Sequence, residues 1–240
     1  MVKVDLARRA NPEDLPEMMD QPCTCEELNA CLRDIARVNR LTGAYRPTFE
    51  WFAELVKRQE KDTEQLQIVD VGCGYGDSLR RLHGWAVRQG IALSLTGIDL
   101  NGDAIRAATA ATPKGMNIRW VHGDAFSYAG EVDVVLSSLL THHLAEAEIV
   151  RFLAWMEARA RRGWFVNDLH RKAFPYYAFR VISRLLPFHA FVRHDGPVSI
   201  RRSFLVEDWQ RMCAEARLPV GKFSIREYRP ARLCVGRIKR

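Results

Sequence analysis

The chain has 240 residues, of which 48% are hydrophobic and 27% are charged, a balance that supports one globular domain with a small addition and excludes a disordered chain. No apolar run reaches the roughly 18–20 residues that span a bilayer. Residues 1–20 also contain no apolar segment of the kind that forms a signal peptide. We therefore expect a cytoplasmic protein.

The net charge of +7 is unevenly distributed along the chain. Residues 1–150 carry 16 basic against 22 acidic side chains, whereas residues 151–240 carry 20 basic against 7 acidic ones. A basic C-terminal third is compatible with a nucleic acid, an anionic lipid or an anionic small molecule as partner. The six cysteines have no paired C-x-x-C spacing, so the sequence predicts neither a disulfide framework nor a metal site.

The first 64 residues are expected to form an N-terminal addition. Residues 1–21 are polar and contain proline, which predicts a loose arm. A helix is expected from Thr24, where Glu27 completes a capping box, to the region of Gly43. A second helix is expected over residues 47–60, because it has proline in its first turn and an apolar face.

Residues 65–240 alternate between two periodicities. Strand-like runs are expected at 66–72, 93–100, 117–126, 133–140 and 163–168, and helices at 78–90, 101–111 and 146–162. A helix at 206–218 and two closing strands at 222–228 and 231–239 follow. This alternation predicts an α/β fold, with a doubly wound and mostly parallel sheet covered on both faces.

One segment interrupts the alternation. Residues 171–193 have apolar side chains at helical spacing, among them Phe174, Tyr177 and Val181, with Arg180 and Arg184 on the other face. We interpret the segment as an inserted amphipathic helix, serving as a lid over an acceptor site or as a dimerisation helix. Residues 193–204 surround a Gly-Pro pair, which predicts a turn. The alternatives are an anion-binding segment, a part of the lid insert 171–204, or a solvated basic loop.

The sequence VDVGCGYGD at 69–77 lies where the first strand turns into a helix, with glycine at 72, 74 and 76. In a doubly wound sheet this turn lies at the carboxyl end of the strand, where absent side chains let a nucleotide approach the backbone. The spacing differs from the G-x-G-x-x-G of dinucleotide folds, and turn-forming glycines without a ligand are the alternative.

Two further acids follow the next two strands. Asp99 ends the second strand, where a carboxylate can accept both hydrogen bonds of a ribose diol. Asp124 follows the third strand and is placed to face an adenine amino group, although it could simply cap a helix. Three successive strand ends of this kind favour a nucleotide-type site.

These motifs, together with LLTHHL after the fourth strand, resemble those of class I S-adenosylmethionine-dependent methyltransferases, particularly the ubiquinone/menaquinone and small-molecule tailoring types. The resemblance implies a Rossmann-like sheet of seven strands with S-adenosylmethionine as cofactor. It also implies that the Gly72–Gly76 loop holds the methionine part, Asp99 the ribose, and Asp124 with Ala125 the adenine. The cofactor residues it assigns are Asp70, Gly72, Cys73, Gly74, Gly76, Asp99, Leu100, Asp124 and Ala125.

Methyl transfer needs a base only if the acceptor must lose a proton. The ends of the fourth and fifth strands supply His142, His143, Asp168 and His170 as candidates. A histidine can take a phenolic proton near pH 7, although one of two adjacent histidines often only satisfies a backbone carbonyl.

The aromatic insert favours a small hydrophobic acceptor that is phenolic, quinone-like or polyketide-derived, and its arginines would suit a peripheral membrane contact through 171–193. The alternatives are an RNA methyltransferase, a cofactor-binding scaffold without turnover and an NAD(P) oxidoreductase. No nucleic-acid module is recognisable, so a nucleic-acid partner is not expected.

Overall fold

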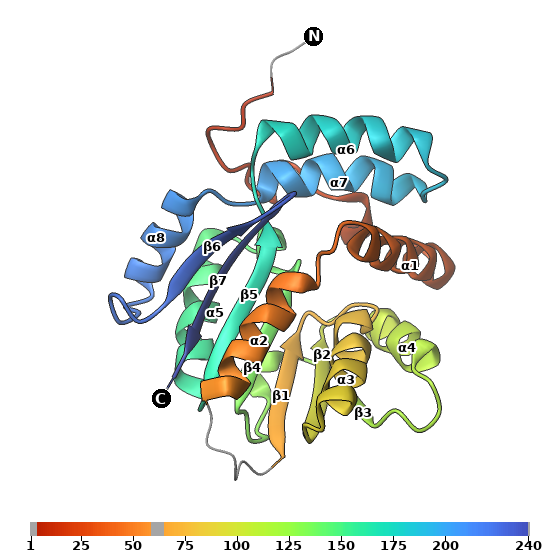
Figure 1. Cartoon of the computed structure of the whole chain (residues 1–240). Coiled ribbons are helices and arrows are strands. Elements are labelled where there is room, and N and C mark those ends of the chain that lie inside the picture. The colour runs from red at the N-terminus through yellow and green to blue at the C-terminus, as the bar shows by residue number, and fades with distance from the viewer. Residues whose placement is uncertain (1–3, 59–64, 240) are drawn as a thin grey trace.

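The computed structural model describes residues 4–58 and 65–239 and contains one seven-stranded sheet of order β3-β2-β1-β4-β5-β7-β6 (Figure 1). Only β7 runs against its neighbours, because its pairings with β5 and β6 are antiparallel whereas the other pairings are parallel. The strands are β1 Leu66–Val71, β2 Leu93–Asp99, β3 Ile118–His122, β4 Val134–Ser138, β5 Gly163–Leu169, β6 Ser224–Tyr228 and β7 Arg232–Ile238. The α/β architecture predicted from the sequence is confirmed.

Helices cover both faces of the sheet. The helices are α1 Cys25–Leu41, α2 Arg46–Arg58, α3 Asp77–Gln89, α4 Gly102–Ala111, α5 Glu146–Arg159, α6 Ala173–Leu185, α7 Ala190–Arg202 and α8 Val206–Glu215. In β1, Ile68 packs with α2 and α3 on one face, whereas the next residue, Val69, packs with α5 and α8 on the other. This alternation is the period of two that a strand buried on both faces requires.

The cap of α1 forms as the sequence predicts. The backbone N–H of Glu27 donates to Thr24 Oγ1, and the Thr24 N–H donates back to Glu27 Oε2. The second expected helix, over residues 47–60, corresponds to α2 within the residues that the structure describes. Positions 59 and 60 lie outside the described residues.

The parallel register brings several strand ends to one edge of the sheet. Ile68 lies opposite Leu95 of β2 and Val134 of β4, so the carboxyl ends of β1, β2 and β4 are close together. The helices α1, α6 and α7 lie over this edge together with residues 4–20, which we call the N-terminal segment (Figure 1). The fold therefore places a helical cover where the candidate site residues emerge.

Two expectations are wrong. Residues 193–204 do not form a loop around a turn, because α7 continues through Gly196 and Pro197 to Arg202. The described part of the N-terminal arm is not loose either. It is held by a backbone hydrogen bond from Ala10 to Arg201 and by the N–H groups of Met18 and Met19, which donate to the Asp195 carboxylate at 2.8 and 3.1 Å.

None of the helices within residues 4–58 and 65–239 combines the length and hydropathy that crossing a bilayer requires.

Candidate active site

A cavity of about 1160 Å³ opens at the carboxyl edge of the sheet. Its walls combine the glycine-rich turn, the ends of β2 and β4, the N-terminal segment and the inner sides of α1, α6 and α7. All nine predicted cofactor residues except Gly76 line it, as do His142 and His143. The geometry therefore gathers residues from distant parts of the chain around one space.

The glycine-rich turn depends on left-handed backbone. Gly72 and Gly76 have φ values of 68° and 72°, which side-chain-bearing residues rarely adopt. A Cβ at Gly76 would also lie 2.2 Å from the Trp120 ring, and one at Gly72 would lie 2.9 Å from the Leu140 side chain. The turn is consequently packed against Trp120 at Gly76 and against Leu140 at Gly72, while Gly72 and Gly74 line the cavity.

Asp70, at the end of β1, is a buried acid without a full set of partners. Its Oδ1 atom has no hydrogen-bond partner among the described residues. Burial, with the charges of Asp77 and Asp99, raises the pKa of Asp70 well above its usual value. Such a carboxyl group at the wall of a cavity is suited to accept a hydrogen bond from a ligand.

Asp99 joins the glycine-rich turn to the end of β2. Its carboxylate accepts hydrogen bonds from the N–H groups of Gly74 at 2.8 Å and Asn101 at 2.9 Å. Burial raises the pKa of Asp99, although those two bonds oppose the rise. A carboxylate has about four lone-pair sites, so capacity remains for a ligand diol.

Asp124, Ala125 and Leu100 also line the cavity. Asp124 also acts as a helix cap, because its Oδ1 accepts a hydrogen bond from the Phe126 N–H at 2.9 Å at the start of a short 3₁₀ helix, Ala125–Ser127. The capping role anticipated as an alternative is therefore present, and it fixes the direction of the carboxylate.

The two adjacent histidines follow β4 and are each held by a different acid. His142 is buried, and its Nδ1 lies 2.7 Å from Asp168 Oδ1. Asp168 also accepts from Thr141 Oγ1 and from the His142 backbone N–H. Burial alone would raise the pKa of Asp168, but the interactions with His142 and Thr141 outweigh burial and lower it.

His143 lines the cavity together with His142, and the two ring centroids lie 4.3 Å apart. Its Nδ1 is 3.0 Å from Asp20 Oδ1. Burial opposes a charge on His143, but the hydrogen bond to Asp20 and the charge of Glu17 prevail and raise its pKa.

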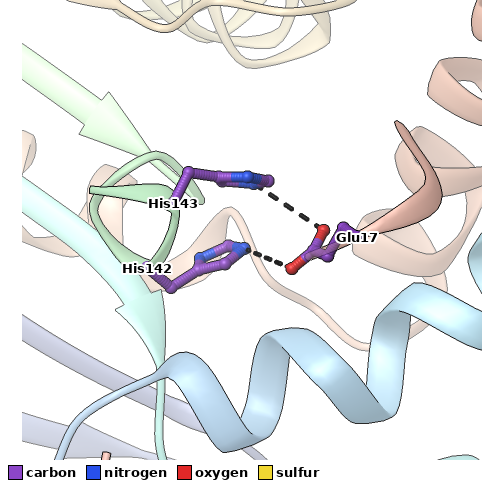
Figure 2. Close-up of side chains that lie close together, drawn as sticks. All are labelled: Glu17, His142 and His143. Carbon is purple, nitrogen blue, oxygen red and sulfur yellow. Dashed lines mark ion pairs between the residues drawn. The ribbon is translucent and has the colours of Figure 1, made fainter. Parts of the chain in front are cut away.

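Glu17 is a site residue that the sequence analysis missed. Its side chain is 1% exposed, and its two carboxylate oxygens lie 3.7 Å from His142 Nε2 and 3.9 Å from His143 Nε2 (Figure 2). Ser199 and Arg202 of α7 contact the same carboxylate. No periodic pattern marks residues 4–20, so only their content of acids could have drawn attention to them.

The other two predicted base candidates do not line the cavity. Asp168 lies behind His142. His170 lies at the end of β5, 3.8 Å from Glu227, and burial with the charge of Lys172 lowers its pKa. The cavity thus favours His142 and His143 over His170.

The insert covers the cavity with one side of α6. Its side chains Phe174, Ala178 and Ile182, spaced four residues apart, line the space. Tyr177 and Val181 do not line it. Both rows are partly exposed, since Phe174 and Ile182 are 75% and 50% exposed, against 39% and 60% for Tyr177 and Val181. The single apolar stripe expected from the sequence is therefore divided between the cavity and the outer surface.

Comparisons with known proteins agree with this geometry. Residues 68–163 match a family model described as a methyltransferase domain. No curated protein matches the chain.

Many solved structures share the fold. Magnesium protoporphyrin IX methyltransferase from Synechocystis PCC 6803, solved with bound SAH, is 15% identical over 82% of this chain and 84% of that one, with a TM-score of 0.55. The plantazolicin methyltransferase BpumL in complex with SAH is 14% identical over 88% and 86%, also with a TM-score of 0.55. The CMeT domain of the citrinin polyketide synthase is 14% identical over 80% and 51%, with a TM-score of 0.58.

Proposed function

The chain belongs to the class I S-adenosylmethionine-dependent methyltransferases, and on this premise we propose that it methylates a small hydrophobic acceptor bound in the cavity beneath α6. The observation that carries the proposal is the continuity of the cavity. It runs from the glycine-rich turn and Asp99, past the two histidines, to the apolar side of α6.

The residues at the strand ends fit the cofactor. The Gly72–Gly76 turn would lie against its methionine part, and the unpaired Asp70 oxygen would accept a hydrogen bond there. Asp99 would bind the ribose, while Asp124 and Ala125 would lie beside the adenine. When bound, S-adenosylmethionine supplies an electrophilic methyl group and a neutral thioether leaving group.

The cavity walls favour a flat, apolar acceptor. Phe174, Phe179 and Ile182 contribute the side that faces away from the sheet, while Leu28 and Leu32 contribute another wall from α1. Alignment of the acceptor and exclusion of water are what an in-line displacement requires of the protein. We propose a phenolic, quinone-like or polyketide-derived acceptor, with its reacting atom beside His142 and His143, between the glycine-rich turn and α6.

RNA is a weaker candidate acceptor, because much of the basic C-terminal third is used within the fold. Arg171 donates to Ser203 and Asp208, Arg202 contacts Glu17 and Asp20, and Arg232 donates to Asn39, all three with buried side chains. Binding of RNA needs basic side chains that are free to contact its phosphate backbone.

The outer row of α6 supports a peripheral membrane contact. Val181 and Leu185 are 60% and 77% exposed, and Arg180 and Arg184 lie on the same helix. Exposed apolar side chains beside arginines suit an anionic lipid surface, from which a lipophilic acceptor could be collected. Co-sedimentation with anionic and neutral vesicles tests this contact.

A labelled-methyl experiment tests the proposed reaction. Purified protein is incubated with methyl-labelled S-adenosylmethionine and fractions of host extract, separated into lipophilic small molecules and RNA. We expect label in the lipophilic fraction, and much less with the Asp99→Ala variant when the cofactor concentration is near the Kd of the unmodified protein. Label in RNA alone would replace the proposed acceptor class, and cofactor binding without transfer to any fraction would favour the non-catalytic alternative.

A further inference from the structure

The histidine pair and Glu17 have an arrangement that neither the fold nor cofactor binding requires. Carboxylates only accept hydrogen bonds, so the contacts of His142 Nδ1 with Asp168 and of His143 Nδ1 with Asp20 place a proton on each Nδ1. The Nε2 atoms of both rings point toward the Glu17 carboxylate (Figure 2), and in the neutral form of each ring they carry a lone pair. Lone pairs that face a carboxylate repel it unless a proton or a metal ion lies between them.

The charges around the cluster also favour a cation. Glu17, Asp20 and Asp168 contribute three carboxylates, against the guanidinium of Arg202, which lies 3.4 Å from Glu17 and 2.9 Å from Asp20. Arg9 adds a second guanidinium nearby, where it donates to the Leu144 carbonyl at 2.7 Å and to the His142 carbonyl at 3.4 Å. The side chains in and around the cluster therefore retain a negative balance when both histidines are neutral.

We propose that His142 Nε2, His143 Nε2 and Glu17 bind one divalent first-row transition-metal ion. The three ligand atoms lie within 4.8 Å of one another. Binding at the usual lengths of about 2.0–2.2 Å would bring neighbouring ligand atoms to roughly 3–3.4 Å, a contraction that needs a small movement of the Glu17 segment. Two nitrogens and one carboxylate oxygen suit Zn²⁺, Mn²⁺ or Fe²⁺.

The acids behind the ligands have the arrangement of a metal site's outer shell. A ligating histidine usually donates its other N–H to a carboxylate or carbonyl, which fixes the tautomer and the ring direction. Asp168 does this for His142, and Asp20 does it for His143. Both histidines also line the cavity, so the remaining coordination positions would face an acceptor.

The role of the ion in catalysis rests on the proposed function, whereas its binding does not. A metal ion beside the acceptor would lower the pKa of a coordinated hydroxyl group and hold the oxygen in place. The two histidines would then be ligands, and not the general bases that the sequence predicts.

Cobalt binding tests the site directly. Chelator-treated full-length protein is titrated with Co²⁺, whose visible absorption reports nitrogen and oxygen ligation, and with Zn²⁺ by calorimetry. We expect one equivalent of each ion to bind. Glu17→Gln and His142→Asn should weaken binding by at least about 100-fold, because each removes a ligand. His83→Asn, on α3 outside the cavity lining, is the matched control and should bind normally.

The possible outcomes distinguish a bound metal ion from a proton on the histidines. They also keep the test of the metal site independent of the test of the proposed function. Less than a tenth of an equivalent bound, or binding that Glu17→Gln does not change, would overturn the site and leave a proton as the cation on the histidines. Circular dichroism confirms that the variants fold, and Glu17→Asp, which keeps a carboxylate, should retain partial binding. Stoichiometric binding supports the site even if no methyl transfer is found.

Discussion

Single residues in this site hold the local fold together and also line the cavity. Asp99 orders the glycine-rich turn through Gly74 while presenting its carboxylate to the cavity. Asp124 caps the 3₁₀ helix that carries Ala125. The strand-end acids could be predicted because a carboxylate after a buried strand stands out in the sequence. Glu17 could not, since its partners His142 and Arg202 lie far along the chain from it.

Replacing Asp99 by Ala should weaken S-adenosylhomocysteine binding by about 1.5–3 kcal/mol, because charge-assisted hydrogen bonds are lost. This corresponds to a roughly 10- to 150-fold higher Kd in isothermal calorimetry. Asp99→Asn keeps one acceptor oxygen and should lose less. Unchanged affinity in a folded Asp99→Ala variant would show that the ribose is bound elsewhere.

At the scale of elements, the strands and most helices were predictable because their apolar periods are long and uninterrupted. The path of α7 was not, because Gly196-Pro197 is a typical turn signal and the helix is held by tertiary contacts. Asp195, which precedes this pair, is buried against the N-terminal segment, and Phe179 of α6 packs on Gly196 itself. The glycine is thus needed for close helix packing.

Gly196→Ala should destabilise the protein, since the new Cβ would lie 2.0 Å from Phe179 Cε1. Overpacking of this kind costs about 1–3 kcal/mol. For a chain of this size each kcal/mol lowers Tm by roughly 2–4 °C in a calorimetric scan. The control is Gly84→Ala within α3, where the nearest atom is 3.6 Å away and a helix glycine is replaced without a clash, so Tm should rise or stay constant. Equal effects of the two substitutions would argue against close packing of α6 on α7.

The two rows of α6 should differ in their effect on the acceptor. Ile182→Ser changes a cavity-lining side chain and should raise the acceptor's KM several-fold, while S-adenosylhomocysteine affinity stays within a factor of about two. Val181→Ser, one position earlier on the exposed row, should leave both values unchanged when the acceptor is supplied in solution without lipid. If instead Val181→Ser alters KM and Ile182→Ser does not, the acceptor lies outside the cavity.

At the scale of the whole molecule, the N-terminal segment closes the site across the fold. It contacts α7 through Asp195 and reaches the loop after β4 through Arg9, which donates to the Leu144 carbonyl at 2.7 Å. The segment contributes Glu17 and Asp20 to the cavity. Its contacts cross nearly the full length of the chain, which explains why local sequence patterns do not reveal them.

Asp195→Asn should loosen this segment, because an amide has only one oxygen to accept the two backbone N–H groups of Met18 and Met19. Loss of a charge-assisted bond worth about 1.5–3 kcal/mol predicts roughly 10- to 150-fold faster amide exchange at Met18 and Met19. Hydrogen-exchange mass spectrometry of peptides covering 10–20 measures the change, with Glu13→Gln as a control. Identical exchange in Asp195→Asn and the unmodified protein would mean that other contacts hold the segment.

Trp120 lies directly under the glycine-rich turn, against both Gly76 and Gly97, and its indole N–H donates to Thr112. An indole ring in this position responds optically to small changes in the backbone above it. Cofactor binding at the turn should therefore alter the intrinsic fluorescence of Trp120, and comparison with Trp120→Phe isolates that signal from those of the other tryptophans. The tryptophan that shapes the turn would thus also report, through its fluorescence, whether the cofactor site is occupied.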